Sequence, residues 1–185
     1  LLNSDTIVPP GAIDRLLDRL RHTPEAAVAG PRLVDGLGRA ELSFGAMITP
    51  LNEWRRRRLM RRLAGDDAEA RAHVEAVTRQ EQFPDWVTGA CLLVRRPDAE
   101  AVGLLDERFF MYTEDVDFCA SIRARGRKVL FTPAAEVVHL RGRSGVAAPA
   151  ATRAGYVRSH LAFYRKHHLL LWPLLRLYRA LRGGL

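Results

Sequence analysis

Three carboxylates follow a run of aromatic side chains in the middle of the sequence. Glu114, Asp115 and Asp117 come just after the segment "RFFMY", residues 108–112. The dipole and the unbonded N–H groups of a helix N-terminus stabilise negative charge, so a first helical turn is an ordinary place for acidic residues. Beside large apolar side chains, however, a carboxylate is partly desolvated, which raises its pKa while the helix terminus lowers it. A carboxylate balanced in this way is a candidate general base.

Two further groups of residues lie where predicted strands end. Asn3 and Asp5 belong to the string "LLNSD", and His139 belongs to "VVHL". A carboxylate and an imidazole at the carboxyl ends of strands are suited to hold a divalent cation against phosphate oxygens. The glycine-rich loop that follows His139 offers diphosphate ligands, namely Arg141, Arg143 and Ser144. The structural alternatives are an Asx turn at Asp5 and an ordinary strand-edge histidine.

The string "WVTGAC", residues 86–91, supplies a fourth candidate. Gly89 permits a close approach of backbone or ligand, and Trp86 is able to stack on the apolar face of a sugar. The alternative is a core tryptophan at the start of a strand, followed by a β-bulge glycine.

The elements that must position these residues alternate between strand and helix. "GAIDRLLDRLRH" has helical spacing, "AAVAGPRLV" predicts a buried strand with a Gly30-Pro31 break, and residues 52–82 predict two short charged helices around Gly65-Asp66. Further on, we expect one strand at 86–96, a helix from Asp115 to Arg125, two short strands around Pro133 and a basic amphipathic helix pair broken at Pro173. The order strand, helix, strand favours an α/β fold with parallel strands.

The totals limit the class of protein. The 185 residues carry a net charge of +8, which favours an anionic partner such as a phospholipid surface, nucleic acid or a phosphorylated substrate. The two cysteines, Cys91 and Cys119, are far apart, which argues against a disulfide framework or a zinc site. The chain starts without Met, and "LLNSD" is typical of the end of a buried strand, so we expect a fragment of a longer protein.

Five strings, in the order in which they occur along the chain, resemble the second half of a family 2 glycosyltransferase, closest to bacterial rhamnosyltransferase-like members. They cover about residues 1–145 and read "LLNSD", "GPRLVDGLG", "WVTGACLLVRR", "GLLDERFFMYTEDVDFCASIRARG" and "VVHLRGRSG". The resemblance implies the C-terminal part of a GT-A (Rossmann-like) domain, with a mixed sheet flanked by helices and C-terminal amphipathic helices. It places this domain at residues 1–150, with a charged helical insertion at 52–82, and a basic helical tail at 151–185.

The resemblance also implies roles for single residues. Asp115 matches the catalytic base, supported by Glu114, while Asp5 and His139 match ligands of Mg²⁺ or Mn²⁺ on the donor diphosphate. The remaining matches are substrate-binding positions, namely Asn3, Trp86, Thr88, Gly89, Ala90, Asp117, Arg141, Arg143 and Ser144. Asn3 departs from the family pattern, because an acid often stands at its position. The family's nucleotide-binding half is missing upstream, so residues 1–185 alone are expected to be inactive.

The implied enzyme is a metal-dependent, inverting hexosyltransferase of cell-envelope polysaccharide synthesis. Its donor would be a dTDP- or UDP-sugar, and its acceptor a glycan or a polyprenyl-diphosphate-linked sugar. We expect it at the cytoplasmic face of the membrane as a peripheral protein, without a nucleic-acid partner. Six arginines in "WRRRRLMRR", residues 54–62, and the basic tail support lipid or diphosphate contact. They also support the alternative, a non-catalytic basic module that binds a membrane surface or nucleic acid.

Overall fold

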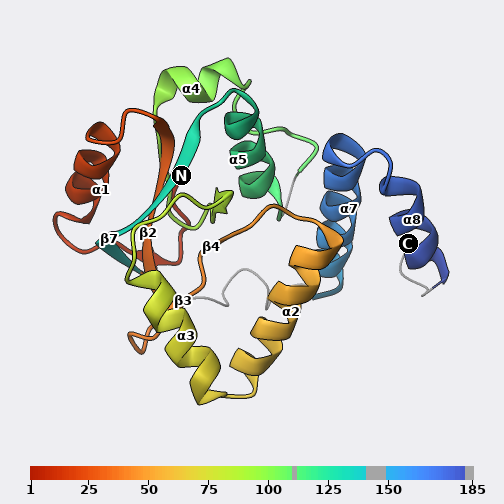
Figure 1. Ribbon diagram of the computed structural model, residues 1–185, viewed down its shortest axis with the longest axis horizontal. Helices are drawn as coiled ribbons and strands as arrows, with labels where there is room; N and C mark the ends of the chain where they lie inside the picture. The colour runs from red at the N-terminus through yellow and green to blue at the C-terminus, as the bar shows by residue number, and fades with distance from the viewer. Residues whose placement is uncertain (110–111, 141–148, 182–185) are drawn as a thin grey trace.

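A mixed sheet lies at the centre of the computed structural model, which describes residues 1–109, 112–140 and 149–181 (Figure 1). Its strands run in the order β1, β7, β2, β3, and β6 also pairs with β2, while β4 and β5 form a separate pair. The strand bounds are Thr6–Ile7 for β1, Ala26–Val34 for β2, Ala40–Glu41 for β3, Phe44–Gly45 for β4, Trp86–Val87 for β5, Leu93–Val94 for β6 and Lys128–His139 for β7.

The two long strands, β2 and β7, are parallel neighbours, and an α/β fold with parallel strands is what the sequence favours. The two short strands expected around Pro133 are wrong, because β7 runs unbroken to His139. A register shift opposite Pro31 and Arg32 takes up residues 133–135 as an irregularity, so the ladder continues on both sides. The break expected at Gly30-Pro31 is also absent, because both residues pair with β7 and β2 runs through them without ending. The other strand pairs are antiparallel, which makes the sheet mixed.

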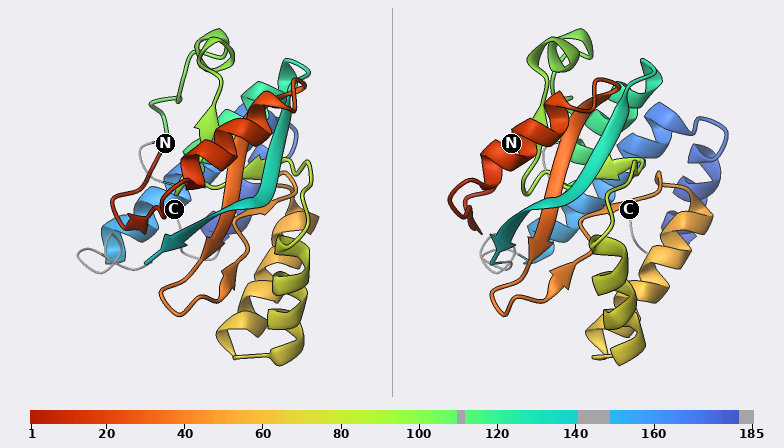
Figure 2. Two further views of the ribbon diagram at one scale, coloured as in Figure 1. Left: turned by 90° about the vertical axis from the view of Figure 1, so that its left-hand side faces the viewer. Right: turned by 60° about the vertical axis from the view of Figure 1, so that its left-hand side comes forward.

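Helices cover both faces of this sheet (Figure 2). On one face α1 buries Leu16 and Leu20 against small residues of β2 and against Leu130 of β7. On the other face α5 contributes Phe118, Cys119 and Ile122 to the main core, and α7 adds Phe163 and Tyr164. Burial on both faces explains why β2 is apolar almost throughout instead of alternating. The helix bounds are Ala12–Arg21 for α1, Arg96–Ala101 for α4, Glu114–Ala124 for α5 and Pro149–His167 for α7.

The charged segment forms two helices, α2 (Pro50–Ala64) and α3 (Ala68–Thr78), on either side of Gly65, as predicted. Each has a side-chain N-cap: the Thr49 hydroxyl accepts from the N–H of Asn52, and the Asp67 carboxylate accepts from that of Ala70. They project from the sheet as a hairpin (Figure 1).

The C-terminal segment forms α7 and α8 (Trp172–Leu181), but the break between them is not at Pro173. The helices separate at residues 168–171, and Pro173 is the second residue of α8, where a missing N–H costs little. Because α7 places Phe163 and Tyr164 in the main core, it packs as part of the same body as the sheet. Within residues 1–109, 112–140 and 149–181, no helix is long and apolar enough to cross a membrane.

Candidate functional site

The acidic segment takes its geometry from an unusual entry into α5. Tyr112 and Thr113 both have left-handed backbones, with φ of 63° and 73°. Such conformations cost roughly 1–3 kcal/mol each for residues other than glycine, and they often occur at functional sites. Thr113 is the N-cap, but its side chain makes no capping hydrogen bond. The sharp turn starts the helix at Glu114, so Asp115 lies in the first turn.

The Asp115 carboxylate is held from two sides. Its Oδ2 accepts a 2.8 Å hydrogen bond from the N–H of Gly89, and its Oδ1 accepts one of 2.8 Å from the N–H of Val116. The Thr88 hydroxyl adds a further hydrogen bond. A Cβ atom on Gly89 would lie 3.3 Å from Cβ of Asp115, so glycine allows this close approach. The structure thus brings Thr88, Gly89 and Asp115 together, although 26 residues separate the last two.

Burial sets the protonation behaviour of both acids. It raises the pKa of Asp115 above the ordinary aspartate value, although the hydrogen bonds from Gly89, Val116 and Thr88 oppose it. Burial, and then the charge of Asp115, raise the pKa of Glu114. Its Oε2 is shielded from water and has no hydrogen-bond partner among the residues described. Asp115 is therefore a fixed carboxylate of increased basicity, and each of its oxygens retains lone pairs for a further proton.

The N-terminal segment connects this acid to the strand ends. The segment expected as one strand, 86–96, instead forms two short strands with a turn between them, and residues 90–92 pair with the chain start. The N–H of Asn3 donates to the carbonyl of Ala90 at 2.9 Å. Asn3 is thus a backbone neighbour of the loop that contacts Asp115, and Asp5 lies two residues further on.

Asp5 lies against His139, at the end of β7. Thr6 pairs with His139 in the sheet, and the N–H of Leu140 donates to the Asp5 carbonyl at 2.8 Å. Oδ1 of Asp5 is 3.5 Å from Nε2 of His139, and both side chains are largely buried. On the opposite side of the ring, Nδ1 of His139 is 3.2 Å from Oε2 of Glu41, on β3. Sequence spacing did not indicate Glu41, because it is 98 residues from His139.

The pair Asp5–His139 fits two ligands of one divalent ion. A proton on Nδ1, directed at Glu41, leaves the lone pair of Nε2 facing the Asp5 carboxylate, and a cation between the two satisfies both. Two ligands of one Mg²⁺-sized ion, each at about 2.1 Å, lie about 3–4 Å apart. In residues 1–109, 112–140 and 149–181, no three or more Asp, Glu, His or Cys converge as a complete metal site. Arg141, Arg143 and Ser144 lie outside the described residues.

Trp86 lies away from this site. Its ring is buried in the core, its indole N–H donates to the carbonyl of Ala46 at 2.9 Å, and Arg56 covers its face at 4.7 Å. Gly45 allows the ring to pack directly on the backbone of β4. These contacts explain why a tryptophan occupies this position without any need for it to stack on a sugar.

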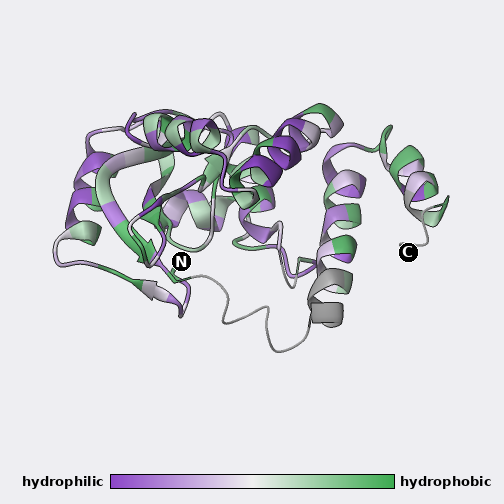
Figure 3. Cartoon of the chain, turned by 90° about the horizontal axis from the view of Figure 1, so that it is seen from below, coloured by the Kyte–Doolittle hydropathy of each residue, from purple (hydrophilic) through white to green (hydrophobic). Residues whose placement is uncertain are grey.

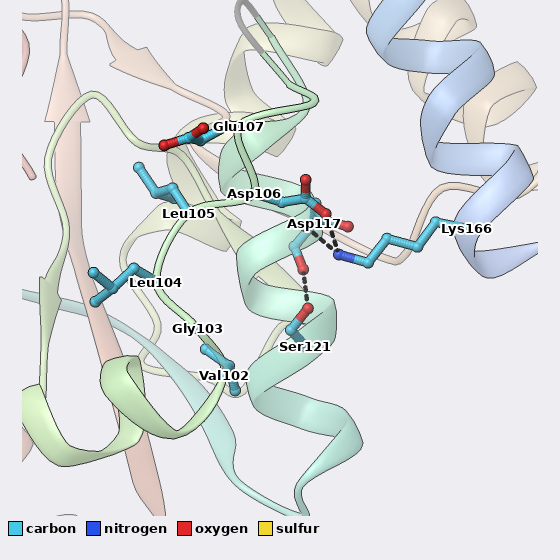
Figure 4. A pocket seen from close by; sticks show the side chains of 9 residues that line it. All are labelled: Val102, Gly103, Leu104, Leu105, Asp106, Glu107, Asp117, Ser121 and Lys166. Atoms are coloured by element: carbon cyan, nitrogen blue, oxygen red, sulfur yellow. Dashed lines mark hydrogen bonds and ion pairs between the residues drawn. The ribbon is translucent and has the colours of Figure 1, made fainter.

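Asp117 points to the opposite side of α5 from Asp115, since two residues along a helix turn the side chain by about 200°. Its carboxylate is 2% exposed and binds the ammonium of Lys166 at 2.8 Å and Nε2 of His167 at 2.6 Å, both on α7. Lys166 also binds Asp106 at 2.9 Å. Asp106, Asp117 and Lys166 border a polar cavity of about 340 Å³ beside the loop 102–107 (Figure 4). Asp117 therefore joins α5 to α7.

The arginines of α2 are largely engaged within the protein. Arg56 donates to the carbonyls of Leu42 and Phe44, and Arg62 binds the carboxylates of Asp67 and Glu69. Arg57 binds Glu53. Several arginines of the basic segment 54–62 thus stabilise local structure, although the sequence alone suggests one continuous basic face.

Known proteins that are similar to this chain identify its family. A family model described as "Glycosyltransferase like family 2" matches residues 1–164. N-acetylglucosaminyl-diphospho-decaprenol L-rhamnosyltransferase of Mycobacterium tuberculosis is 32% identical over 170 residues, which are 92% of this chain and 55% of that protein. Rhamnosyltransferase WbbL of Escherichia coli K12 is 36% identical over 55 residues, 30% of this chain and 21% of that one.

A solved structure has the same fold. The crystal structure of GalNAc-T7 with UDP, GalNAc and Mn²⁺ superposes with a TM-score of 0.52 at 16% identity, and the match covers 85% of this chain and 30% of that one. The fold is thus of the GT-A type, as the sequence predicts. The chain spans about half the length of the mycobacterial relatives. The family model extends over most of the chain, from residue 1 to the core residues of α7, so this chain belongs to the glycosyltransferase-like family 2.

Proposed function

We propose that this chain is the catalytic-base half of a metal-dependent, inverting hexosyltransferase. The supporting observation is the carboxylate of Asp115, fixed by Gly89 and raised in pKa, at the end of a path of contacts from Asp5 and His139. One base and one cation site meet the needs of an inverting transfer, whereas a retaining hydrolase needs two carboxylates that bracket the bond.

In the proposed reaction, Asp115 accepts the proton of an acceptor hydroxyl. The hydroxyl oxygen forms a bond to the anomeric carbon of the donor sugar while the bond from that carbon to the diphosphate oxygen breaks. The nucleoside diphosphate leaves with the electron pair. A bound Mg²⁺ or Mn²⁺ would neutralise the charge that develops on the diphosphate. Asp5 and His139 would hold that ion, and Glu41 would fix the histidine ring.

The substrates follow from the same proposal. The donor is a nucleotide-sugar of the dTDP or UDP type, and the acceptor is a glycan or a sugar on a polyprenyl diphosphate in cell-envelope polysaccharide synthesis. The name of the mycobacterial relative, which acts on a decaprenol-linked substrate, supports a lipid-linked acceptor. Such an acceptor would place the enzyme peripherally at the inner face of the cell membrane. Asn3, Thr88, Gly89 and Ala90 would border the substrates. Trp86 would support the site from the core, and Asp117 would support it by joining α5 to α7. Arg141, Arg143 and Ser144 remain proposed diphosphate ligands.

Metal dependence is tested by calorimetric titration of the full-length protein with the nucleotide-sugar, with and without Mn²⁺. EDTA should abolish transfer, and His139→Ala or Glu41→Gln should weaken Mn²⁺-dependent donor binding by about 10- to 100-fold. His22→Ala, on the exposed end of α1, is the matched control and should bind like the wild type. Transfer at an unchanged rate in EDTA would contradict the metal site.

If the protein bound vesicles but transferred no sugar from any nucleotide donor, the non-catalytic module would be favoured.

A further inference from the structure

The positive charge of the chain is concentrated at its C-terminal end. The sequence has 29 basic and 21 acidic residues, and every acidic residue precedes Val137. Twenty of the basic residues lie in that same part, so residues 1–136 are nearly neutral. The last 49 residues carry nine basic side chains and no acidic one. The excess charge therefore lies outside α2, two of whose arginines, Arg57 and Arg62, bind acidic partners.

The same end presents apolar side chains to water. On α8, the residues at positions i, i+3, i+4 and i+7 form one face, namely Leu174, Leu177, Tyr178 and Leu181, with exposed fractions of 64%, 59%, 50% and 79%. Leu169 and Leu170, in the turn before α8, are 69% and 91% exposed. We call these six residues the leucine face. Figure 3 shows α8 beyond α7, at one end of the molecule.

Packing among the described residues does not account for the leucine face. The inner side of α8 is formed by Trp172 and Leu175, which pack against the main core. The helix is thus apolar on two sides, and only one of them is covered by the described residues. A helix of ten residues is also far too short to cross a bilayer, which needs about 20.

Basic side chains lie on the Trp172 side of α8, away from the leucine face. The guanidinium groups of Arg165 and Arg176 lie 5.9 and 5.6 Å from the ring of Trp172. A helix with leucines on one face and arginines on the other is typical of helices that lie in the interfacial plane of a membrane. Apolar protein partners account for the leucines but not for the complete lack of acidic residues over 49 positions. Anionic lipid accounts for both.

We propose that the leucine face and the basic residues of this C-terminal end bind the surface of an anionic phospholipid bilayer, with α8 lying in the plane of the interface. This inference rests on the proposed function in one respect, since a lipid-linked acceptor requires the enzyme to work at a bilayer. Membrane binding at this face would bring the enzyme to its acceptor without a spanning segment.

The test is co-sedimentation of the full-length protein with vesicles of phosphatidylcholine alone or with added phosphatidylglycerol. Binding should be at least about tenfold stronger with phosphatidylglycerol and should weaken as salt rises. Leu170→Gln with Leu174→Gln should weaken binding about tenfold or more. The matched control is Leu37→Gln with Leu51→Gln, two leucines that are 77% and 54% exposed elsewhere, and it should bind as the wild type does.

The outcomes separate this inference from the proposed enzyme activity. The Leu170/Leu174 variant should keep its turnover on a water-soluble acceptor, because neither side chain touches the candidate site. No preference for anionic vesicles in the wild type, or equal binding by the Leu170/Leu174 variant, would overturn the inference. Sedimentation velocity tests the alternative that a second copy of the chain covers the leucine face. A dimer that the Leu170/Leu174 change abolishes, together with a lack of vesicle binding, would support this alternative and overturn the inference.

Discussion

At the scale of single residues, the contact between Gly89 and Asp115 is the most constrained feature of the candidate site. The glycine is needed for space and not for a left-handed backbone, since its missing Cβ is what lets the Asp115 carboxylate reach its N–H. Whatever widens this contact releases the carboxylate from its fixed orientation.

Gly89→Ala should therefore lower transfer by the full-length protein by about 10- to 100-fold, because displacing a catalytic group by a fraction of an ångström to 1 Å has effects of this size. The measurement is kcat/KM beside donor affinity, which should change little. Gly65→Ala is the matched control, since a Cβ there meets only ordinary contacts at 3.5 Å. Equal activity of Gly89→Ala and Gly65→Ala would show that the contact does not matter for catalysis.

The raised pKa of Asp115 predicts the acid side of the pH profile. A carboxylate must be unprotonated to act as a base, and burial makes Asp115 hold its proton to a higher pH than an exposed aspartate does. Transfer should thus fall as pH decreases through a pKa above the ordinary aspartate value, as seen in log kcat/KM against pH. Glu114→Gln removes a neighbouring charge and should move this limb to lower pH. A limb at the ordinary aspartate pKa would contradict the buried base.

At the scale of elements, α5 carries different roles on two sides. Asp115 faces the loop of Gly89, and Asp117 faces α7, where Lys166 and His167 bind it. The second contact is buried, so it holds α7 in place relative to the helix that carries the base.

Asp117→Asn should destabilise the protein by about 3 kcal/mol, because it removes the buried carboxylate that Lys166 and His167 share. Urea unfolding followed by circular dichroism measures this change. Asp106→Asn is the control: it also binds Lys166 but is closer to the surface, so it should cost about 1 kcal/mol or less. If the two variants lost the same small amount, Asp117 would not anchor α7.

Sequence periodicity was enough to predict α1, the α2–α3 pair and α5, because their apolar spacing and end signals are local. It failed at β7 and β2, where a register shift in the pairing, which no local pattern encodes, lets the strands continue past Pro133 and Pro31. The same contrast between local and long-range information holds for the site residues. The motifs indicated Asp115, Gly89, Asp5 and His139, but partners supplied by distant elements could not be predicted, namely Glu41, Lys166 and His167.

At the scale of the whole molecule, the chain has a nearly neutral body and a basic, partly apolar end. The body carries the candidate base and cation ligands, and α7 connects it to α8 through residues of the common core. Because the chain spans about half the length of its mycobacterial relatives, catalysis must be measured on the full-length protein.

The most direct test of the central claim, that Asp115 is the base, compares full-length wild type with Asp115→Asn. Release of nucleoside diphosphate in the presence of acceptor measures turnover, and calorimetric titration measures donor affinity. The amide keeps the size of the side chain but cannot take the proton, so turnover should fall by about 10²- to 10⁴-fold while donor affinity stays within about threefold. Turnover within tenfold of the wild type, with donor binding intact, would contradict the assignment.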